Sequence, residues 1–329
     1  MYKVIVNIEF IKQIPPSVLS RLKAIELNIP SVHAQEAINE LLQQSVLMGG
    51  KRLRPLLTYL FADFFDLPLE KLDTCAKSIE MVHAASLAHD DVIDEATKRR
   101  GEPSINIQAS NKKAVLAGDY LLAAVIGDLC RVGDLRLVEE MAKVIELLSQ
   151  GEWLQSDLVL SRAYSEENLN EIALMKTASV MSWCAVSPAL VKNLNGELIE
   201  YSRQFGQNLG VAFQLLDDTL DFSGDGRKDG LLDLKNGQIN AVLFEWLKLH
   251  PDIKTKFHSG EDIVPLFNEE GLDEALSIVQ LKAKGHLDKC RELLEILKSE
   301  LRGIVSEDIL EKKSKPLLFI LKYLENRRY

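Results

Sequence analysis

Residues 83–94, HAASLAHDDVID, are the stretch that decides what this chain can be. Steps of four, three and four put a set of its residues on one face of one helix: His83, Leu87, Asp90 and Asp94. Carboxylates one helical turn apart repel each other, at a cost of about 0.2–0.5 kcal/mol. Because Leu, Val and Ile stand beside them, the helix is expected to be partly buried, and a cation is the natural partner of its acidic stripe.

Residues 210–221, GVAFQLLDDTLD, repeat the pattern. The matching stripe consists of Gly210, Gln214, Asp217 and Asp221. One DDxxD segment alone can be an exposed acidic turn, but two copies on separate apolar helices favour a metal site. Magnesium is typically held by one or two carboxylates plus substrate phosphates, and no glycine-containing loop of the calcium-binding kind is present. The two segments therefore predict magnesium that binds weakly alone and well together with a diphosphate.

Helical periodicity extends outward from these segments over nearly the whole chain. Gly and Pro fall mainly between the helices, and the strand-like candidate is the short run 2–8. The predicted helices cover residues 34–48, 55–66, 68–94, 114–131, 134–150, 167–193, 197–223, 239–249, 272–301 and 306–326. We expect an all-α fold with a single domain over residues 1–329, including an N-terminal appendage of about thirty residues.

The composition excludes several classes of protein. Lys and Arg total 39 against 49 Asp and Glu, a formal charge of −10, which argues against a nucleic-acid partner. No secretory signal and no run of about 20 apolar residues stands out, so we expect no membrane span and a cytoplasmic location. The four cysteines are far apart in apolar stretches, so buried, reduced thiols are expected.

Basic residues cluster beside the first aspartate segment and before it. GGKRLRP at 49–55 joins a glycine turn to a new helix, and KRRG at 98–101 follows the first aspartates directly. Arg matches phosphate oxygens bidentately, whereas Lys acts as a point charge. Lys176, in the middle of a predicted helix, is either a surface residue with an extended stem or a phosphate ligand aimed inward.

Together these motifs resemble the trans-isoprenyl diphosphate synthases of the polyprenyl type. The resemblance runs from about residue 49 to 233, with motifs in family order: GGKRLRP, HDDVIDEATKRRG, GDYLLA (118–123), GEW (151–153), KTA (176–178) and FQLLDDTLDF (213–222). It implies a helical bundle of the isoprenoid synthase type, with central helices around a deep apolar cavity. It also implies a homodimer that condenses an allylic diphosphate with isopentenyl diphosphate, using two or three Mg²⁺ ions, to a lipophilic, long-chain, all-trans polyprenyl diphosphate.

The resemblance also implies a role for each matching residue. Isopentenyl diphosphate would be bound by Lys51, Arg54, His83 and Arg100. Magnesium would be bound by Asp90, Asp94 and Asp217, with Asp91, Asp218 and Asp221 near them. The allylic diphosphate would be held by Arg99, Lys176 and Lys228, and Thr177 and Gln214 would lie beside the reacting carbons.

The segment after the second aspartates departs from the family pattern. The family has Gly-Lys, a short gap, and then Asp-Leu-x-x-Gly-Lys-x-Thr-x-Pro. In this chain the loop is a few residues short, Gln238 replaces the second lysine, and Asn240 and Val242 replace Thr and Pro. One phosphate-facing charge is lost, and Lys235 or Arg227 are candidates to compensate for it.

Parts of the sequence are also compatible with functions other than that of a synthase. A non-catalytic or regulatory subunit of a heteromeric prenyl synthase has Gln238 as its support, against two intact aspartate motifs. A metal-dependent phosphohydrolase using His83 and His89-Asp90 leaves the second motif unexplained. A terpene cyclase would have no use for the isopentenyl-binding residues.

Product length is expected to depend on two small residues. Ala85 and Ser86 lie about one turn before Asp90, so the hydrocarbon of a substrate whose diphosphate is anchored at Asp90 must pass them. A bulky aromatic here closes the tunnel in short-chain members of the resembling family. Small side chains predict a long product, although they could also serve close helix packing. They leave the path open towards four residues of the next helix: Leu122, Val125, Ile126 and Leu129.

Overall fold

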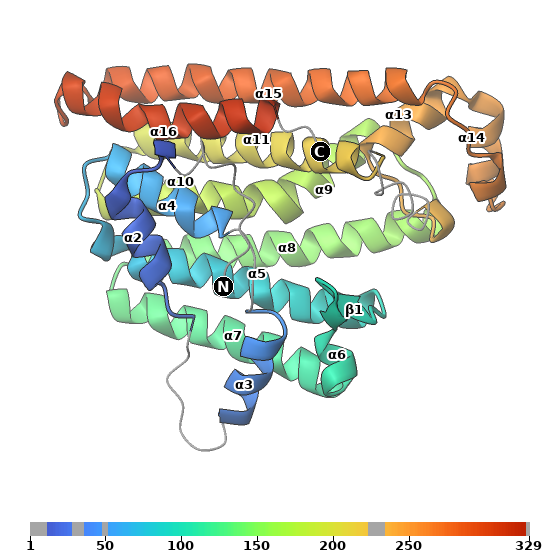
Figure 1. The fold of residues 1–329 in the computed structure, drawn as a ribbon, viewed down its shortest axis with the longest axis horizontal. Coiled ribbons are helices and arrows are strands. Elements are labelled where there is room, and N and C mark those ends of the chain that lie inside the picture. The colour runs from blue at the N-terminus through green and yellow to red at the C-terminus, as the bar shows by residue number, and fades with distance from the viewer. Residues whose placement is uncertain (1–11, 28–35, 48–51, 223–233, 327–329) are drawn as a thin grey trace. The chain divides into compact units, whose positions relative to one another are not determined.

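The computed structural model describes residues 12–27, 36–47, 52–222 and 234–326, which are helical for the most part (Figure 1). The chain divides into two compact units. The first consists of Met1–Ile145, Trp183–Asn195 and Ile304–Pro316, and the second of Glu146–Ser182, Gly196–Gly303 and Leu317–Tyr329. The all-α prediction is confirmed. The single domain stays a prediction, and the strand-like run 2–8 lies outside the described residues.

The first unit is built around α5, Asp73–Ile93, which carries the first aspartate motif. α5 packs along α7, Asn111–Val132, and against α4, Leu53–Phe64 (Figure 1). Buried apolar residues of these helices form its core, among them Leu57, Phe61, Ile79, Val82, Leu121 and Val125. The shorter elements of this unit are α2 at Pro16–Ala24, α3 at Glu36–Gln44, the 3-10 turn η2 at Leu69–Leu72 and α6 at Ile105–Gln108.

A small β-hairpin follows α5, and the sequence analysis did not predict it. β1, Lys98–Arg99, pairs antiparallel with β2, Glu102–Pro103. The two residues between the strands, Arg100 and Gly101, have φ angles of 54° and 86°. Positive φ at both positions is the type I′ turn, which matches the twist of paired strands, and glycine adopts it without strain. The Arg-Gly pair of KRRG is thus a turn signal as well as a basic cluster.

The second unit contains α11, Gly196–Leu220, which carries the second aspartate motif and packs along α15, Leu272–Leu301 (Figure 1). α13, Ala241–Leu249, packs against α15 and is followed by α14, Pro251–His258, and the 3-10 turn η5, Val264–Leu266. α14 was not predicted. Three aromatic side chains pack together beside α13. The ring centroids of Phe222, which follows α11, and Phe267 are 6.2 Å apart, and those of Phe267 and Trp246 are 4.9 Å apart.

Three further helices contribute residues to both units. They are α8 at Leu135–Ser161, α10 at Ser179–Val191 and α16 at Glu307–Glu325. α8 is longer than the predicted 134–150, because Gly151 does not end it. A glycine inside a helix costs about 1 kcal/mol relative to alanine, which tertiary packing readily overrides. Gly151 is buried, so such packing is available.

The stretch 166–191 comprises α9, Glu166–Ala173, the π-helical turn η3, Leu174–Ala178, and α10. Among the described residues it is the candidate that meets the length and mean hydropathy (1.2) of a membrane span, and 72% of its apolar window is buried. Burial of this kind is the mark of a core helix. That the chain has no membrane span stays a prediction.

The expectation for the cysteines is partly wrong. Cys75, Cys184 and Cys290 are buried and free, but Cys130 is exposed. Cys130 lies in the last turn of α7, where Val132 is exposed as well.

Candidate active site

The first aspartate motif occupies the last turn of α5. Asp90 is half-buried and Asp94, the C-cap residue, is exposed. The backbone N–H of Asp94 donates to the carbonyl oxygen of Asp90 at 2.8 Å, so the two residues are one closed helical turn apart. Their carboxylates thus form a solvent-accessible pair of oxygen donors, which is the donor set that magnesium prefers.

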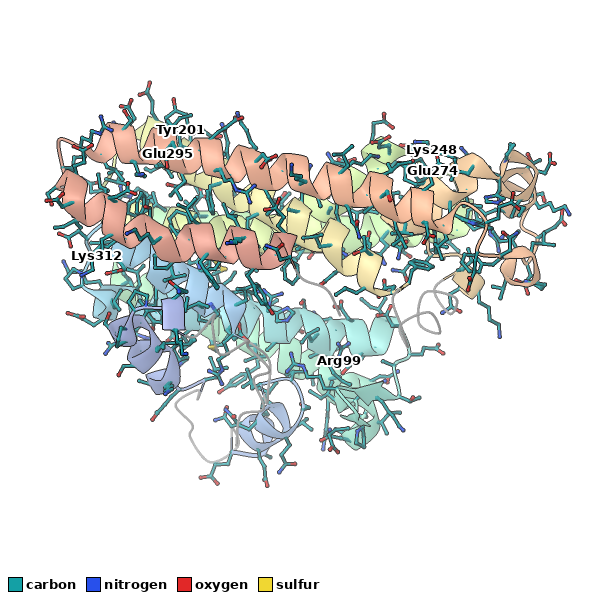
Figure 2. The ribbon with its side chains drawn as sticks, turned by 45° about the horizontal axis from the view of Figure 1, so that its top comes forward. Arg99, Tyr201, Lys248, Glu274, Glu295 and Lys312 are labelled. Carbon is teal, nitrogen blue, oxygen red and sulfur yellow. The ribbon has the colours of Figure 1, made fainter. Side chains whose placement is uncertain are left out.

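Asp91, which lies between Asp90 and Asp94 in the sequence, is fully buried and binds donors of the protein itself. Its Oδ1 accepts a hydrogen bond from Arg99 Nε at 2.6 Å, and its Oδ2 accepts one from the backbone N–H of Ile105 at 3.3 Å. Figure 2 shows Arg99 at the hairpin, beside the end of α5. Asp91 therefore anchors the hairpin and the start of α6 to α5. Its role near magnesium stays a prediction.

Predicted ligands of isopentenyl diphosphate gather around His83. The pKa of His83 is lowered well below its ordinary value, first by burial and then by the charges of Arg54, Arg100 and Arg99. α4, α5 and the hairpin thus bring three guanidinium groups within electrostatic range of one neutral imidazole. Lys51, the remaining predicted ligand, lies outside the described residues.

His89 packs on the GDYLLA motif of α7. Its Nε2 lies 3.2 Å from the carbonyl oxygen of Val115 and 3.5 Å from Asp119 Oδ1. A Cβ atom at Gly118 would come within 2.2 Å of His89 Nε2, so this glycine makes room for the ring. Within residues 12–27, 36–47, 52–222 and 234–326, no three or more His, Cys, Asp or Glu side chains gather to hold a metal ion. The carboxylates of each motif stand in pairs.

The second aspartate motif ends α11 and follows the same plan. Asp217 and Asp221 are half-buried, whereas Asp218 is buried. Asp218 Oδ1 accepts from Gln214 Nε2 at 2.8 Å, and its Oδ2 accepts from the backbone N–H of Ala241, the first residue of α13, at 2.9 Å. Burial raises the pKa of Asp218 to about 7. In both motifs the second aspartate therefore accepts a hydrogen bond from the first residue of a later helix, α6 or α13.

Asn240 also contacts the second aspartate motif. Its Nδ2 donates to Asp221 Oδ2 at 3.3 Å, and its Oδ1 accepts from the backbone N–H of Leu243 at 3.0 Å, capping α13. The sequence analysis recorded Asn240 as a departure from the family and assigned it no function. An asparagine directly before an apolar run is a common helix N-cap, and this signal could have found it.

Lys176 and Thr177 lie on the π-helical turn η3, a geometry that often marks functional sites. Lys176 is half-buried; its Nζ forms an ion pair with Glu152 and donates to Gln155 Oε1 at 3.0 Å. Glu152 belongs to the GEW motif, and a Cβ atom at its neighbour Gly151 would come within 2.7 Å of Lys176 Cγ. The structure thus places Lys176 against α8, and sequence reasoning missed Glu152 and Gln155 as its partners.

Thr177 connects this turn to the second motif. Its Oγ1 donates to Gln214 Oε1 at 2.7 Å, and Gln214 in turn donates to Asp218. The second unit therefore brings together KTA, GEW and FQLLDD, while the first holds the first aspartates and the residues around His83. Lys228 lies outside the described residues. That the two motifs face each other stays a prediction.

The residues predicted to control chain length lie on α5. Ala85 is fully buried, and Ser86 is half-buried with its hydroxyl donating to the carbonyl oxygen of His83 at 2.9 Å. On α7, which packs along α5, Val125 and Leu129 are buried. The structure thus places Ala85 and Ser86 on α5, next to the helix towards which the growing product is expected to run.

Comparison with known proteins identifies the family. The family model described as polyprenyl synthetase matches residues 35–260. Solanesyl-diphosphate synthase 1 of Oryza sativa subsp. japonica is 33% identical over 264 residues, which are 74% of this chain and 60% of that protein. A prenyl transferase of Porphyra purpurea is 33% identical over 256 residues, 74% of this chain and 76% of that protein. The chain thus spans less than two thirds of the rice protein.

Solved structures share the fold of this chain. The crystal structure of heptaprenyl diphosphate synthase from Staphylococcus aureus has a TM-score of 0.71 at 26% identity, covering 97% of this chain and 99% of that one. A decaprenyl diphosphate synthase from Rhodobacter capsulatus has a TM-score of 0.74 at 24% identity, covering 98% and 97%. Motifs, fold and family model agree, and the chain belongs to the polyprenyl synthetase family.

Proposed function

We propose that this chain is a long-chain trans-polyprenyl diphosphate synthase. The observation that carries the proposal is the matched construction of the two aspartate motifs. Each presents a pair of accessible carboxylates one turn apart, while the aspartate between them is buried and engaged by protein donors. Such pairs of oxygen donors fit Mg²⁺ ions that share their coordination shell with a diphosphate. Asp90 and Asp94 would hold Mg²⁺ for the diphosphate, as would Asp217 and Asp221.

Ionisation of the allylic substrate begins the reaction. The carbon–oxygen bond to the diphosphate breaks, and its electron pair leaves with the diphosphate. Bound Mg²⁺ would supply Lewis-acid stabilisation of that leaving charge. Arg99 and Lys176 would hold the same group by charge and hydrogen bonds. In the structure Lys176 is paired with Glu152, so the carboxylate keeps the ammonium ordered and oriented until a diphosphate competes for it.

The allylic cation needs oxygen dipoles and no water. Thr177 Oγ1 donates a hydrogen bond to Gln214 Oε1, so the orientation of the hydroxyl is fixed and its lone pairs are available to stabilise positive charge. The alkene of isopentenyl diphosphate, held by Arg54, Arg100 and neutral His83, donates its electron pair to form the carbon–carbon bond. The proton lost from the neighbouring carbon passes to the departed diphosphate. No separate protein base is required for this step.

The test uses the purified protein alone with farnesyl diphosphate, radiolabelled isopentenyl diphosphate and Mg²⁺. The proposal expects inorganic diphosphate and long polyprenyl diphosphates in chromatography, lost when the metal is chelated. Phosphate release without carbon–carbon bond formation would indicate a phosphohydrolase, and inactivity without a second chain would indicate a regulatory subunit. As a homodimer, which is also part of the proposal, the active protein would elute from a sizing column at about twice its monomer mass of 36.9 kDa. Cytoplasmic location completes the proposal and is tested by cell fractionation.

A further inference from the structure

The position of Asn240 suggests a function for a residue that departs from the family pattern. Asn240 is half-buried and makes hydrogen bonds in two directions. Its Nδ2 donates to Asp221 Oδ2 at 3.3 Å, and its Oδ1 accepts from Leu243 N at 3.0 Å. An amide has separate donor and acceptor atoms, so one side chain can fix the carboxylate and the helix end at the same time.

Next to the hydrogen bond between Asn240 and Asp221 lies a chain of further hydrogen bonds. The neighbouring N–H, that of Ala241, binds Asp218, and Asp218 is bound in turn by Gln214 and through it by Thr177. The first turn of α13 thus holds two carboxylates of the second motif, one by its backbone and one by its cap. Any movement of this turn changes the directions in which their remaining lone pairs point.

We propose that Asn240 is a positioning residue for the second aspartate motif: its amide group sets the orientation of Asp221 for metal and diphosphate. This inference rests on the proposed function. A partner outside the coordination shell that orients a ligand typically contributes about 10- to 100-fold to metal affinity, because without it the ligand must be ordered when the metal binds. For one neutral donor we expect the lower end of this range, about tenfold.

Two substitutions separate orientation from capping. Asn240→Ser keeps a good N-cap, but its hydroxyl is too short to serve Leu243 and Asp221 together. Asn240→Ala removes both bonds. Calorimetry of Mg²⁺ binding in the presence of inorganic diphosphate should show about tenfold weaker affinity for both variants. Melting should separate them: the Ser variant stays within about 1 °C of the wild type, and the Ala variant melts about 1–3 °C lower.

A matched control comes from Ser110, the N-cap of α7, which accepts from Lys113 N at 3.2 Å and has no part in the proposed site. Ser110→Ala should lower the melting temperature like Asn240→Ala and leave Mg²⁺–diphosphate affinity unchanged. Wild-type affinity in Asn240→Ser, or an equal loss in Ser110→Ala, would overturn the proposal. Because binding is measured without condensation, a chain that binds Mg²⁺ and diphosphate but makes no product contradicts the proposed function and leaves this inference standing.

Discussion

Asp90 and Asp91 are neighbours with opposite surroundings, and their alanine variants should behave oppositely. Asp90→Ala removes an accessible carboxylate of a repelling pair, so unfolding free energy should change by less than about 0.5 kcal/mol while condensation falls at least about 100-fold. Asp91→Ala leaves Arg99 and the Ile105 N–H without their buried acceptor, which should cost about 3 kcal/mol or more. Urea unfolding and product assays check both. Wild-type stability in Asp91→Ala would refute the anchoring role.

His83 should make stability depend on pH. Its pKa is depressed in the folded protein, so below about pH 6.5 the unfolded chain binds a proton that the folded chain does not. Stability is therefore fully present above that pH and falls as the pH drops, by up to about 1.4 kcal/mol per pH unit for one group. Urea unfolding at about pH 7.5 and pH 5.5 should show a smaller loss in His83→Gln than in the wild type. Equal losses would show that other groups carry the pH dependence.

Residue-level prediction from the sequence succeeded where spacing decides the answer. The four-residue step placed Asp90 with Asp94 and Asp217 with Asp221, and the structure confirms both helices. Spacing could not tell that Asp91 and Asp218 are buried, because their donors Ile105 and Ala241 lie 14 and 23 residues further along the chain. Those contacts depend on the path of the chain after each helix.

At the scale of elements, α11 approaches η3 and the start of α10 closely. Cβ atoms at Gly206 and Gly210 would come within 2.4 Å of Ser182 Cα and 2.3 Å of Ala178 Cα. Gly210→Ala should therefore force backbone to move and lower the unfolding free energy by about 1–3 kcal/mol despite the better helix propensity of alanine. It should also lower activity, because the Thr177–Gln214 contact lies between the same elements. Urea unfolding and product assays measure the two effects.

Gly285 supplies the control for this prediction. It lies inside α15 of the same unit, and a Cβ atom there would meet nothing within 4 Å. Gly285→Ala should stabilise the protein by about 0.5–1 kcal/mol. If Gly210→Ala were also stabilising, the close approach of the two helices would be wrong.

Most helices could be predicted because their apolar residues recur with a strong helical period. The end of α8, the π turn η3 and the β-hairpin could not be predicted from that period. Gly151 looks like a helix end in the sequence, yet Lys176 packs on it and the helix continues. The π turn inserts one residue without a distinctive composition. Both are decided by tertiary contacts, which single-sequence periodicity does not contain.

At the scale of the molecule, the length of the product tests whether the growing hydrocarbon passes Ala85 in the first unit. Ala85 is fully buried on α5. Ala85→Phe should fill the space beside α7, cost about 1–3 kcal/mol by overpacking, and shorten the main product by several isoprene units. Chromatography of dephosphorylated products with the same allylic primer measures the change. Unchanged product length in a folded variant would show that the growing chain takes another route.

The hydrogen bonds that Asp91 accepts from Ile105 N and that Asp218 accepts from Ala241 N have a consequence for how this protein can evolve. Each turns the segment after an aspartate motif into a closed loop whose two ends are fixed. For such a loop, doubling the length costs only about 0.6 kcal/mol of closure entropy. Insertions and deletions that leave the site residues of the segment, such as Asp94, Arg99 and Arg100, in place should therefore change the free energy of unfolding little, provided that the closing residues keep their places. A segment after Phe222 that is a few residues shorter than the family pattern, as the sequence leads us to expect, should therefore cost little stability as long as Asn240 and Ala241 stay in register.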